Sequence, residues 1–96
     1  VLKRTGPANN NPLSFPLSGY TLALDFKYHP DLLPVLDTLD EVILEAGGRV
    51  YLAKDARLSQ QNFQRMYPRW EEFATVRRAL GAHHHFHSLL SRRLGL

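Results

Sequence analysis

Cysteine is absent from the 96 residues, which excludes disulfides, thiolate catalysis and metal sites with cysteine ligands. Long apolar runs are absent too, and none approaches the roughly 18 residues that a membrane-spanning helix needs. Spacing reveals no glycine-rich phosphate loop, paired-carboxylate site or nucleophile–base pair. The 44% hydrophobic and 22% charged fractions are those of one small globular domain. Catalysis by this chain alone therefore has no support.

Charge of either sign is unevenly distributed along the chain. Residues 1–48 contain three basic and six acidic side chains, whereas residues 49–96 contain nine basic and three acidic ones. A basic second half is typical of a surface that meets a phosphate-bearing ligand, a nucleic acid or an acidic partner. A solvated arginine-rich surface explains the same pattern, so both interpretations stay open.

The first half alternates between loop, strand and helix signals. Residues 5–18 contain three prolines and three consecutive asparagines, which predict a loop. Residues 19–28 alternate between apolar and polar or small side chains, which predicts a strand. Apolar residues recur at helical spacing over 32–46, with an acidic face expected to point into solvent and a stop at Gly47-Gly48. The apolar run 50–52 predicts another short strand.

The second half has the signals of short helices. Ser59 suits an N-cap for residues 60–66, and a second helix is expected from Pro68 to about Leu80. A last helix over 87–94 should point its leucines inward and two arginines outward, namely Leu89, Leu90, Leu94, Arg92 and Arg93. The fold class is therefore α+β: a small antiparallel or mixed sheet with a long amphipathic helix, followed by short C-terminal helices. Because Val1-Leu2-Lys3-Arg4 begins without Met and inside a strand-like run, we expect a fragment of a larger protein.

Lys54 is the best candidate for an active-site residue. It follows the predicted strand 50–52 and precedes a loop, a position from which a rigid element presents a side chain into a cleft. A fixed positive charge there could stabilise negative charge on a flavin ring. The alternative is an exposed lysine paired with Asp55.

Two further patterns invite binding hypotheses. His83 and His87 lie i, i+4 in His83-His84-His85-Phe86-His87 and could share a helical face, but no carboxylate or cysteine is near, so we expect a surface turn and no metal site. Arginines interleaved with aromatic residues suggest nucleic-acid binding. However, four of the apolar residues form one helical stripe that is more typical of a core: Trp70, Phe73, Val76 and Leu80.

Several segments together, in one continuous register, resemble the C-terminal part of FAD-linked oxidases of the vanillyl-alcohol-oxidase type. The segments are Val1-Leu2-Lys3, Gly6-Pro7, Pro12-Leu13-Ser14-Phe15-Pro16, Gly19, Asp25-Phe26, Gly47-Gly48-Arg49, Tyr51, Ala53-Lys54-Asp55, Met66-Tyr67-Pro68-Arg69 and Arg92-Arg93-Leu94. The resemblance implies a fragment of a two-domain flavoprotein. Residues 1–49 would end the substrate (cap) domain, and residues 50–96 would pack against an FAD-binding domain outside this chain.

The resemblance also implies roles for particular residues. Lys54 matches the lysine that contacts the flavin, with Tyr51 and Ala53 beside it at the cofactor. Substrate-pocket positions are matched by five residues: Val1, Lys3, Thr21, Ala23 and Tyr51. The reaction implied is oxidation of a sugar-like secondary alcohol to a ketone by hydride transfer to FAD, which the missing domain would mainly bind.

Partners and location follow from the same resemblance. We expect the remainder of the polypeptide and a sugar or polyprenyl-phosphosugar-like substrate as partners, with no nucleic acid and no membrane span. An exposed sheet edge could also join copies into a homo-oligomer. The expected location is cytoplasmic, or peripheral to a membrane for a lipid-linked substrate. The alternative from another class is a small basic non-catalytic module that binds nucleic acid or an acidic partner.

Overall fold

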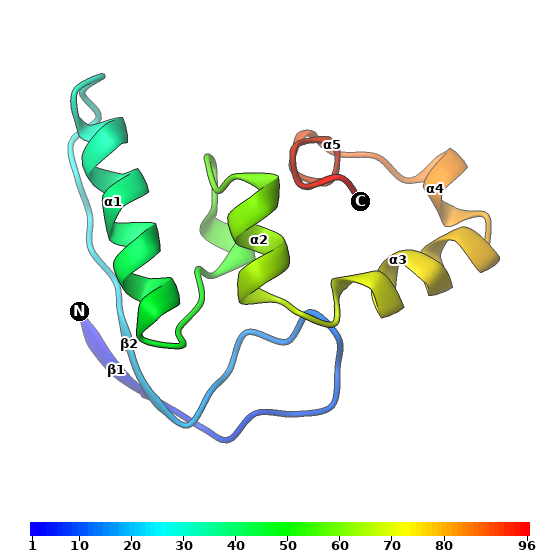
Figure 1. Cartoon of the computed structure of the whole chain (residues 1–96), viewed down its shortest axis with the longest axis horizontal. Helices are drawn as coiled ribbons and strands as arrows, with labels where there is room; N and C mark the ends of the chain where they lie inside the picture. Colours follow the sequence, from blue (N-terminus) through cyan, green and yellow to red (C-terminus); the bar gives the residue numbers. More distant parts are fainter.

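The computed structural model describes residues 1–96, in which a two-stranded sheet precedes a series of helices (Figure 1). The elements are β1 (Leu2–Thr5), β2 (Gly19–Leu22), α1 (Leu32–Glu45), the 3₁₀ turn η1 (Leu52–Lys54), α2 (Gln60–Met66), α3 (Trp70–Ala79), α4 (Ala82–His85) and α5 (Leu89–Leu94). The α+β class and the order of sheet, long helix and short helices are confirmed. None of the helices combines the length and apolar character that a bilayer crossing requires.

The sheet is shorter than the alternating pattern predicts. β2 pairs antiparallel with β1, with Leu22 opposite Leu2. Val1 and Ala23 then exchange two backbone hydrogen bonds of 2.8 Å, and no pairing extends beyond Ala23. The predicted strand over 19–28 is wrong beyond Leu22. Apolar side chains past this point remain exposed: Leu24, Phe26 and Tyr28.

Helix α1 is confirmed, and its end has a clear local cause. Gly47 adopts the left-handed conformation with φ +70°, which glycine takes without the Cβ penalty of other residues. Its N–H donates to the Leu44 carbonyl at 2.9 Å, and the Gly48 N–H donates to the Ile43 carbonyl at 2.8 Å. These two bonds form a Schellman motif, which satisfies carbonyls that the helix end would otherwise leave unpaired.

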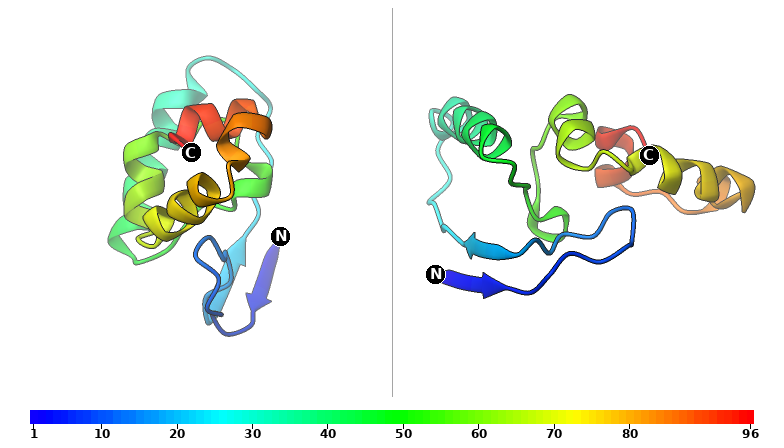
Figure 2. Two further views of the ribbon diagram at one scale, coloured as in Figure 1. Left: turned by 90° about the vertical axis from the view of Figure 1, so that its right-hand side faces the viewer. Right: turned by 60° about the horizontal axis from the view of Figure 1, so that its bottom comes forward.

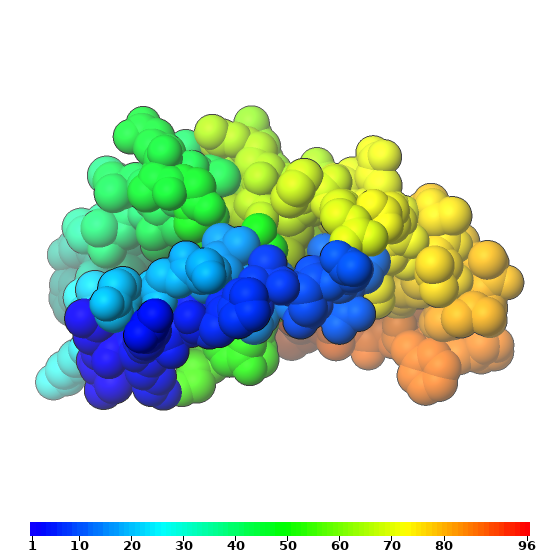
Figure 3. All heavy atoms as spheres, turned by 90° about the horizontal axis from the view of Figure 1, so that it is seen from below, coloured from blue at the N-terminus to red at the C-terminus, as the bar shows by residue number.

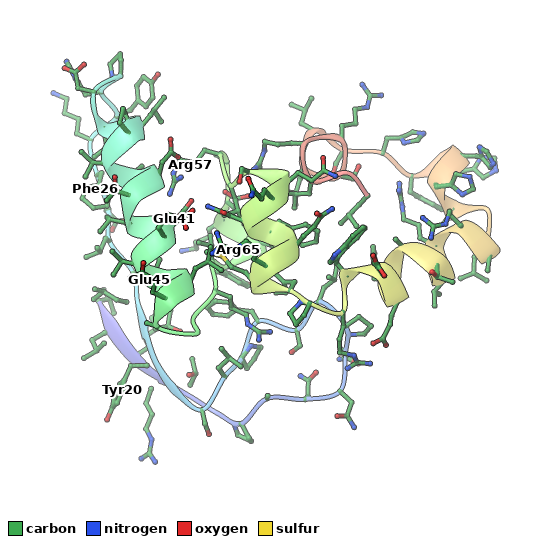
Figure 4. All side chains as sticks on the ribbon, in the orientation of Figure 1. Tyr20, Phe26, Glu41, Glu45, Arg57 and Arg65 are labelled. Carbon is green, nitrogen blue, oxygen red and sulfur yellow. The ribbon has the colours of Figure 1, made fainter.

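The expectation that the whole acidic face of α1 meets solvent is wrong, whereas the predicted apolar stripe is confirmed in part, since Leu32, Leu36 and Ile43 are partly buried. Part of the acidic face points at the second half of the chain, and Asp40 is 2% exposed. Figure 4 shows Glu41 between α1 and α2, close to Arg65. The physical reason is that arginines of the second half bind these carboxylates. The apolar side chains left open on α1 include Val35 and Val42, which are 53% and 55% exposed.

The core of the chain lies almost entirely in its second half. Five buried side chains pack together from the loop before α2, from α2 and its C-cap, and from α5: Leu58, Phe63, Met66, Tyr67 and Leu94. The predicted strand 50–52 is wrong, since no partner strand lies beside it. The backbone of Val50 is instead held by side chains: its carbonyl accepts from Tyr67 Oη at 2.6 Å, and its N–H points at Met66 Sδ at 3.4 Å.

The C-terminal helices follow the sequence signals in part. The stripe expected to be core is wrong at Val76 and Leu80, which are 57% and 76% exposed, and α4 forms where a turn was expected. Ser59 caps α2 by accepting from the Asn62 N–H at 3.1 Å, as predicted. Gly81, with φ +66°, terminates the α3 region. The expected inward face of α5 is wrong for Leu89, which is 85% exposed, because α5 begins only there, after its Ser88 cap. The expected outward arginines are wrong for Arg93, which contacts Asp55.

Far more surface is exposed than a folded protein of this mass normally shows. The accessible surface is 7135 Å², against about 5,600 Å² expected for a folded monomer of the same mass. In Figure 2 the hairpin and its long loop lie as a separate layer beneath the helices. Figure 3 shows this layer from below, where it covers the left-hand and central parts of the view. The chain thus leaves a large surface without cover.

Candidate functional site

Lys54 ends a single 3₁₀ turn and does not follow a strand. Its N–H donates to the Tyr51 carbonyl at 3.1 Å, and the Asp55 N–H donates to the Leu52 carbonyl at 3.3 Å. Leu52 packs against the buried core, which anchors the turn. The backbone that carries Lys54 is therefore fixed, although the predicted strand before it is not there.

The side chain of Lys54 is exposed and makes no hydrogen bond or ion pair within the chain. The pairing with Asp55 considered from the sequence is wrong, because the Asp55 carboxylate binds Arg93 at 2.8 Å. An ammonium group on a fixed backbone, with no carboxylate neutralising it, can stabilise negative charge that develops on a molecule placed against it.

Tyr51 lies beside Lys54 and is half exposed. Its ring packs against Phe15 with centroids 4.8 Å apart and a tilt of 45°. One side of Tyr51 is thereby held by the 5–18 loop while 46% of the residue stays accessible. Ala53, between Tyr51 and Lys54, is also exposed. The three residues predicted to meet a cofactor thus share one accessible turn.

The structure brings four of the predicted substrate residues onto one face of the hairpin. Lys3 stands directly opposite Thr21, and Val1 forms a hydrogen-bonded pair with Ala23. Opposite residues, and residues two apart on a strand, project to the same face of a sheet. Thr21 and Ala23 are partly buried, whereas Tyr20 on the other face is 72% exposed and points away from the helices (Figure 4). This face is therefore turned toward the body of the molecule.

Arg49 connects the loop after the hairpin's first strand to the core. Its guanidinium donates to the Ser14 carbonyl at 2.8 Å and lies 5.1 Å from the centre of the Tyr67 ring. Burial raises the pKa of Tyr67 to about 12, although the positive charge of Arg49 acts to lower it. Sequence reasoning gave Arg49 no structural role, and an arginine directly after the glycine helix stop was the signal that could have suggested one.

Two buried carboxylates that sequence reasoning missed hold the loop after Lys54. The Arg57 guanidinium binds both oxygens of Asp40 at 2.8 Å and donates to the Leu36 carbonyl at 2.9 Å. Burial alone would lower the pKa of Arg57, but its hydrogen bonds to Asp40 and the charges of nearby carboxylates raise it above its ordinary value. The Asp55 carboxylate accepts backbone hydrogen bonds from Arg57 and Leu58 at 2.9 and 2.8 Å. The arginines that bind these two carboxylates lie 17 and 38 residues further along the chain, so local sequence did not reveal the pairs.

The histidine segment does not form the i, i+4 face considered from the sequence. Helix α4 ends at His85, and Phe86 is extended, so His87 lies outside the helix. The rings of His83 and His84 lie 3.7 Å apart, and His87 approaches a backbone carbonyl at 3.3 Å. No group of three potential ligands converges on one point here or elsewhere in the chain.

The basic second half is largely committed to contacts within the chain. Four of its arginines pair with carboxylates: Arg57, Arg65, Arg69 and Arg93. Arg49 and Arg77 donate to backbone carbonyls. Because paired charges attract phosphates weakly, the net charge of this half overstates its capacity to bind nucleic acid.

An open groove of about 430 Å³ lies near the end of the chain. It is lined by Leu13, Leu52 and residues of α3, the His85–Ser88 connection and α5. None of the predicted site residues lines this groove.

Comparison with known proteins gives one consistent result. The family model for D-arabinono-1,4-lactone oxidase matches residues 21–94. Decaprenylphosphoryl-β-D-ribose oxidase of Mycolicibacterium smegmatis is 42% identical over all 96 residues of the chain, which correspond to 21% of the length of that oxidase. An uncharacterised protein in the mprA 5′ region of Streptomyces coelicolor is 41% identical and is covered to 26% of its length. The chain therefore spans about a fifth to a quarter of these relatives.

Proposed function

This chain belongs to the D-arabinono-1,4-lactone oxidase family of FAD-linked oxidases, and on that premise we propose that it forms part of the active site of a longer FAD-dependent oxidoreductase. FAD, when bound, would accept a hydride from the carbon of a sugar-like secondary alcohol, which becomes a ketone as its hydroxyl proton is released to solvent. Residues 1–49 would end the substrate domain, and residues 50–96 would pack against the FAD-binding domain. This chain alone would be inactive.

The observation that carries this proposal is the exposed ammonium of Lys54 on a backbone fixed by η1. Such a group fits the charge that accumulates at the pyrimidine edge of a flavin on reduction. Tyr51 and Ala53 are accessible beside it and suit contacts with a flat ring. No glycine-rich phosphate site occurs in the sequence, so the phosphates of FAD would be held by other parts of the polypeptide.

The substrate would lie against the hairpin face that carries Val1, Lys3, Thr21 and Ala23, with Tyr51 at its side. Lys3 supplies a cation for an anionic substrate group, and Thr21 supplies a hydroxyl for a sugar. The name of the Mycolicibacterium smegmatis relative describes a polyprenyl-phosphosugar substrate. A sugar or polyprenyl-phosphosugar-like molecule is therefore the proposed substrate class. The enzyme would work in the cytoplasm, or at a membrane surface where its substrate is lipid-linked.

The first test is Lys54→Met in the full-length protein, with flavin reduction followed by rapid anaerobic mixing with substrate. We expect reduction to slow by about 10²- to 10³-fold, the usual effect of removing one group that stabilises developing charge. The midpoint potential of the flavin should become more negative, because the reduced form loses a cation. Lys27→Met, another exposed lysine, is the matched control and should change neither quantity. A wild-type rate and potential in Lys54→Met would eliminate this role.

The second test asks whether the rest of the polypeptide is needed. This chain, titrated with FAD and followed by flavin fluorescence, should show no stoichiometric binding, whereas the full-length protein should bind. Tight binding or turnover by this chain alone would contradict the proposal that a second domain is required.

A basic module that binds nucleic acid or an acidic partner is the alternative function. It predicts salt-dependent binding to single- or double-stranded DNA, with the affinity falling steeply as salt rises. The ion pairs of Arg57, Arg65, Arg69 and Arg93 argue against it. A homo-oligomer through the open edge of β1 is a separate proposal, tested by sedimentation of the full-length protein.

A further inference from the structure

The backbone just after Lys54 is fixed by one buried carboxylate. Asp55 Oδ1 accepts the backbone N–H groups of Arg57 and Leu58, which closes the chain into a tight turn. Its other oxygen, Oδ2, accepts from Arg93 at 2.8 Å. The Asp55 side chain is 3% exposed, so these partners replace nearly all of its water. Every oxygen of Asp55 is therefore used to hold the turn that follows Lys54.

Arg93 reaches this turn from the last helix, 38 residues along the chain. Its guanidinium also donates to the backbone carbonyls of Leu58 and, at 3.5 Å, Asp55. A planar guanidinium can make these bonds together, whereas an ammonium group cannot span them. Helix α5 itself is anchored by the buried Leu94 and by the Ser88–Ser91 capping box. The position of the Lys54 turn is thus tied to an element with its own anchors.

We propose that Arg93 is a positioning residue for Lys54: acting through the carboxylate of Asp55, it lets helix α5 set where the Lys54 ammonium stands at the flavin. This inference rests on the proposed flavin role of Lys54. The hydrogen bonds of the Arg93 guanidinium all go to Asp55 and Leu58. Arg93 would therefore act on Lys54 only by holding the turn 55–58. The same turn is also bound to α1 by the ion pair between Arg57 and Asp40.

The test is a double-mutant comparison in the full-length flavoprotein, with wild type, Lys54→Met, Arg93→Met and the combined variant. Flavin reduction rate and midpoint potential are measured for each. We expect Arg93→Met to slow reduction at least about 10-fold, because small displacements of a catalytic group are costly. Its potential should shift in the same direction as in Lys54→Met. In the Lys54→Met background, Arg93→Met should slow reduction by less than about twofold, because the group it positions is gone.

A second readout needs neither flavin nor turnover. Trypsin cleaves after lysine, so the rate of cleavage after Lys54, followed by mass spectrometry, reports how firmly the turn is held. We expect faster cleavage in Arg93→Met and no change in Arg92→Met, the matched control, whose side chain is exposed and unpaired in the same helix. Arg93→Lys keeps the positive charge but lacks the planar guanidinium. Its flavin reduction rate and its cleavage rate after Lys54 should lie between those of wild type and Arg93→Met.

The outcomes separate the two proposals. If Lys54→Met slows reduction but Arg93→Met and Arg93→Lys cost nothing, or cost the same in both backgrounds, the positioning role is overturned and the flavin role stands. If Lys54→Met leaves rate and potential unchanged, the flavin role falls and the positioning role falls with it. Where Arg93→Met yields no folded protein, Arg93→Lys carries the same comparison.

Discussion

The two halves of the molecule are held in different ways. Residues 50–96 contain all six buried hydrophobic residues, whereas the only buried residue of residues 1–49 is the charged Asp40. The second half contains the buried core, while the first half adds ion pairs, hydrogen bonds and the partly buried side chains of Leu13, Ile43 and Leu44 at its edge. Many apolar side chains of the first half nevertheless stay exposed, among them Leu24, Phe26, Val35 and Val42. The difference is that the second half is held mainly by burial of apolar side chains and the first half mainly by polar contacts.

The largest expected effect is in the core of the second half. Phe63→Ala removes a ring that is fully buried beside Tyr67, 5.6 Å between centroids. Loss of a buried phenylalanine and the cavity it leaves should lower the free energy of unfolding by about 3–5 kcal/mol. Tyr20→Ala, in the exposed hairpin, should change the stability of this chain by less than about 0.5 kcal/mol. Urea denaturation measures both, and equal costs would abolish the distinction between the halves.

The next largest effect on stability is expected at the buried ion pair between Asp40 of the first half and Arg57 of the second. Asp40→Ala leaves the partly buried Arg57 without its bidentate partner, so we expect a loss of about 3 kcal/mol. Asp37→Ala is the matched control, since Asp37 binds the same guanidinium at 2.8 Å but is 70% exposed. That substitution should cost less than about 1 kcal/mol. Thermal unfolding of the two variants compares them, and similar costs would show that burial of the pair does not matter.

The sequence predicted elements whose causes are local. Helix α1 and its glycine stop, and the serine cap of α2, depend on residues within a few positions of one another. What it mispredicted depends on distant partners: the acidic face of α1 was assigned to solvent because its arginines come 17 to 24 residues later. An ion pair between Lys54 and its neighbour Asp55 was considered from the sequence, but Asp55 binds Arg93 of the last helix.

The candidate site was predicted from family resemblance, and spacing alone did not select it. The strand register adds a physical reason for grouping Val1, Lys3, Thr21 and Ala23, because antiparallel pairing places them on one face. Their roles toward substrate, and that of Lys54 toward flavin, remain predictions. The contact of Arg93 with Asp55 could not have been predicted from sequence, because no local feature distinguishes Arg93 from its neighbour Arg92.

A smaller effect on the free energy of unfolding should appear at alkaline pH, and it should arise from Tyr67 in the second half. The pKa of Tyr67 is raised to about 12, so the unfolded chain ionises near pH 10 while the folded one stays neutral. The contribution of Tyr67 is therefore fully present below pH 10 and is lost as the pH rises toward 12, by about 2–3 kcal/mol in total. Urea midpoints between pH 9 and 12 should fall in wild type. Tyr67→Phe should remove this part of the fall, and an unchanged fall would assign it to other groups.

The smallest effect is at the exposed bridge from α1 to α2. The pKa of Glu41 is lowered, first by the hydrogen bond from Asn62 and then by that from Arg65, at 2.9 and 3.0 Å. A lowered folded pKa means that this contribution is present above the ordinary glutamate pKa and is lost as the pH falls through the lower, folded value. Glu41→Gln should therefore flatten the stability profile slightly on the acid side, and added salt should do the same. Glu45, on the same helix with no partner, supplies the control Glu45→Gln. Should both substitutions flatten the profile equally, the bridge at Glu41 would contribute nothing to the attachment of the first half.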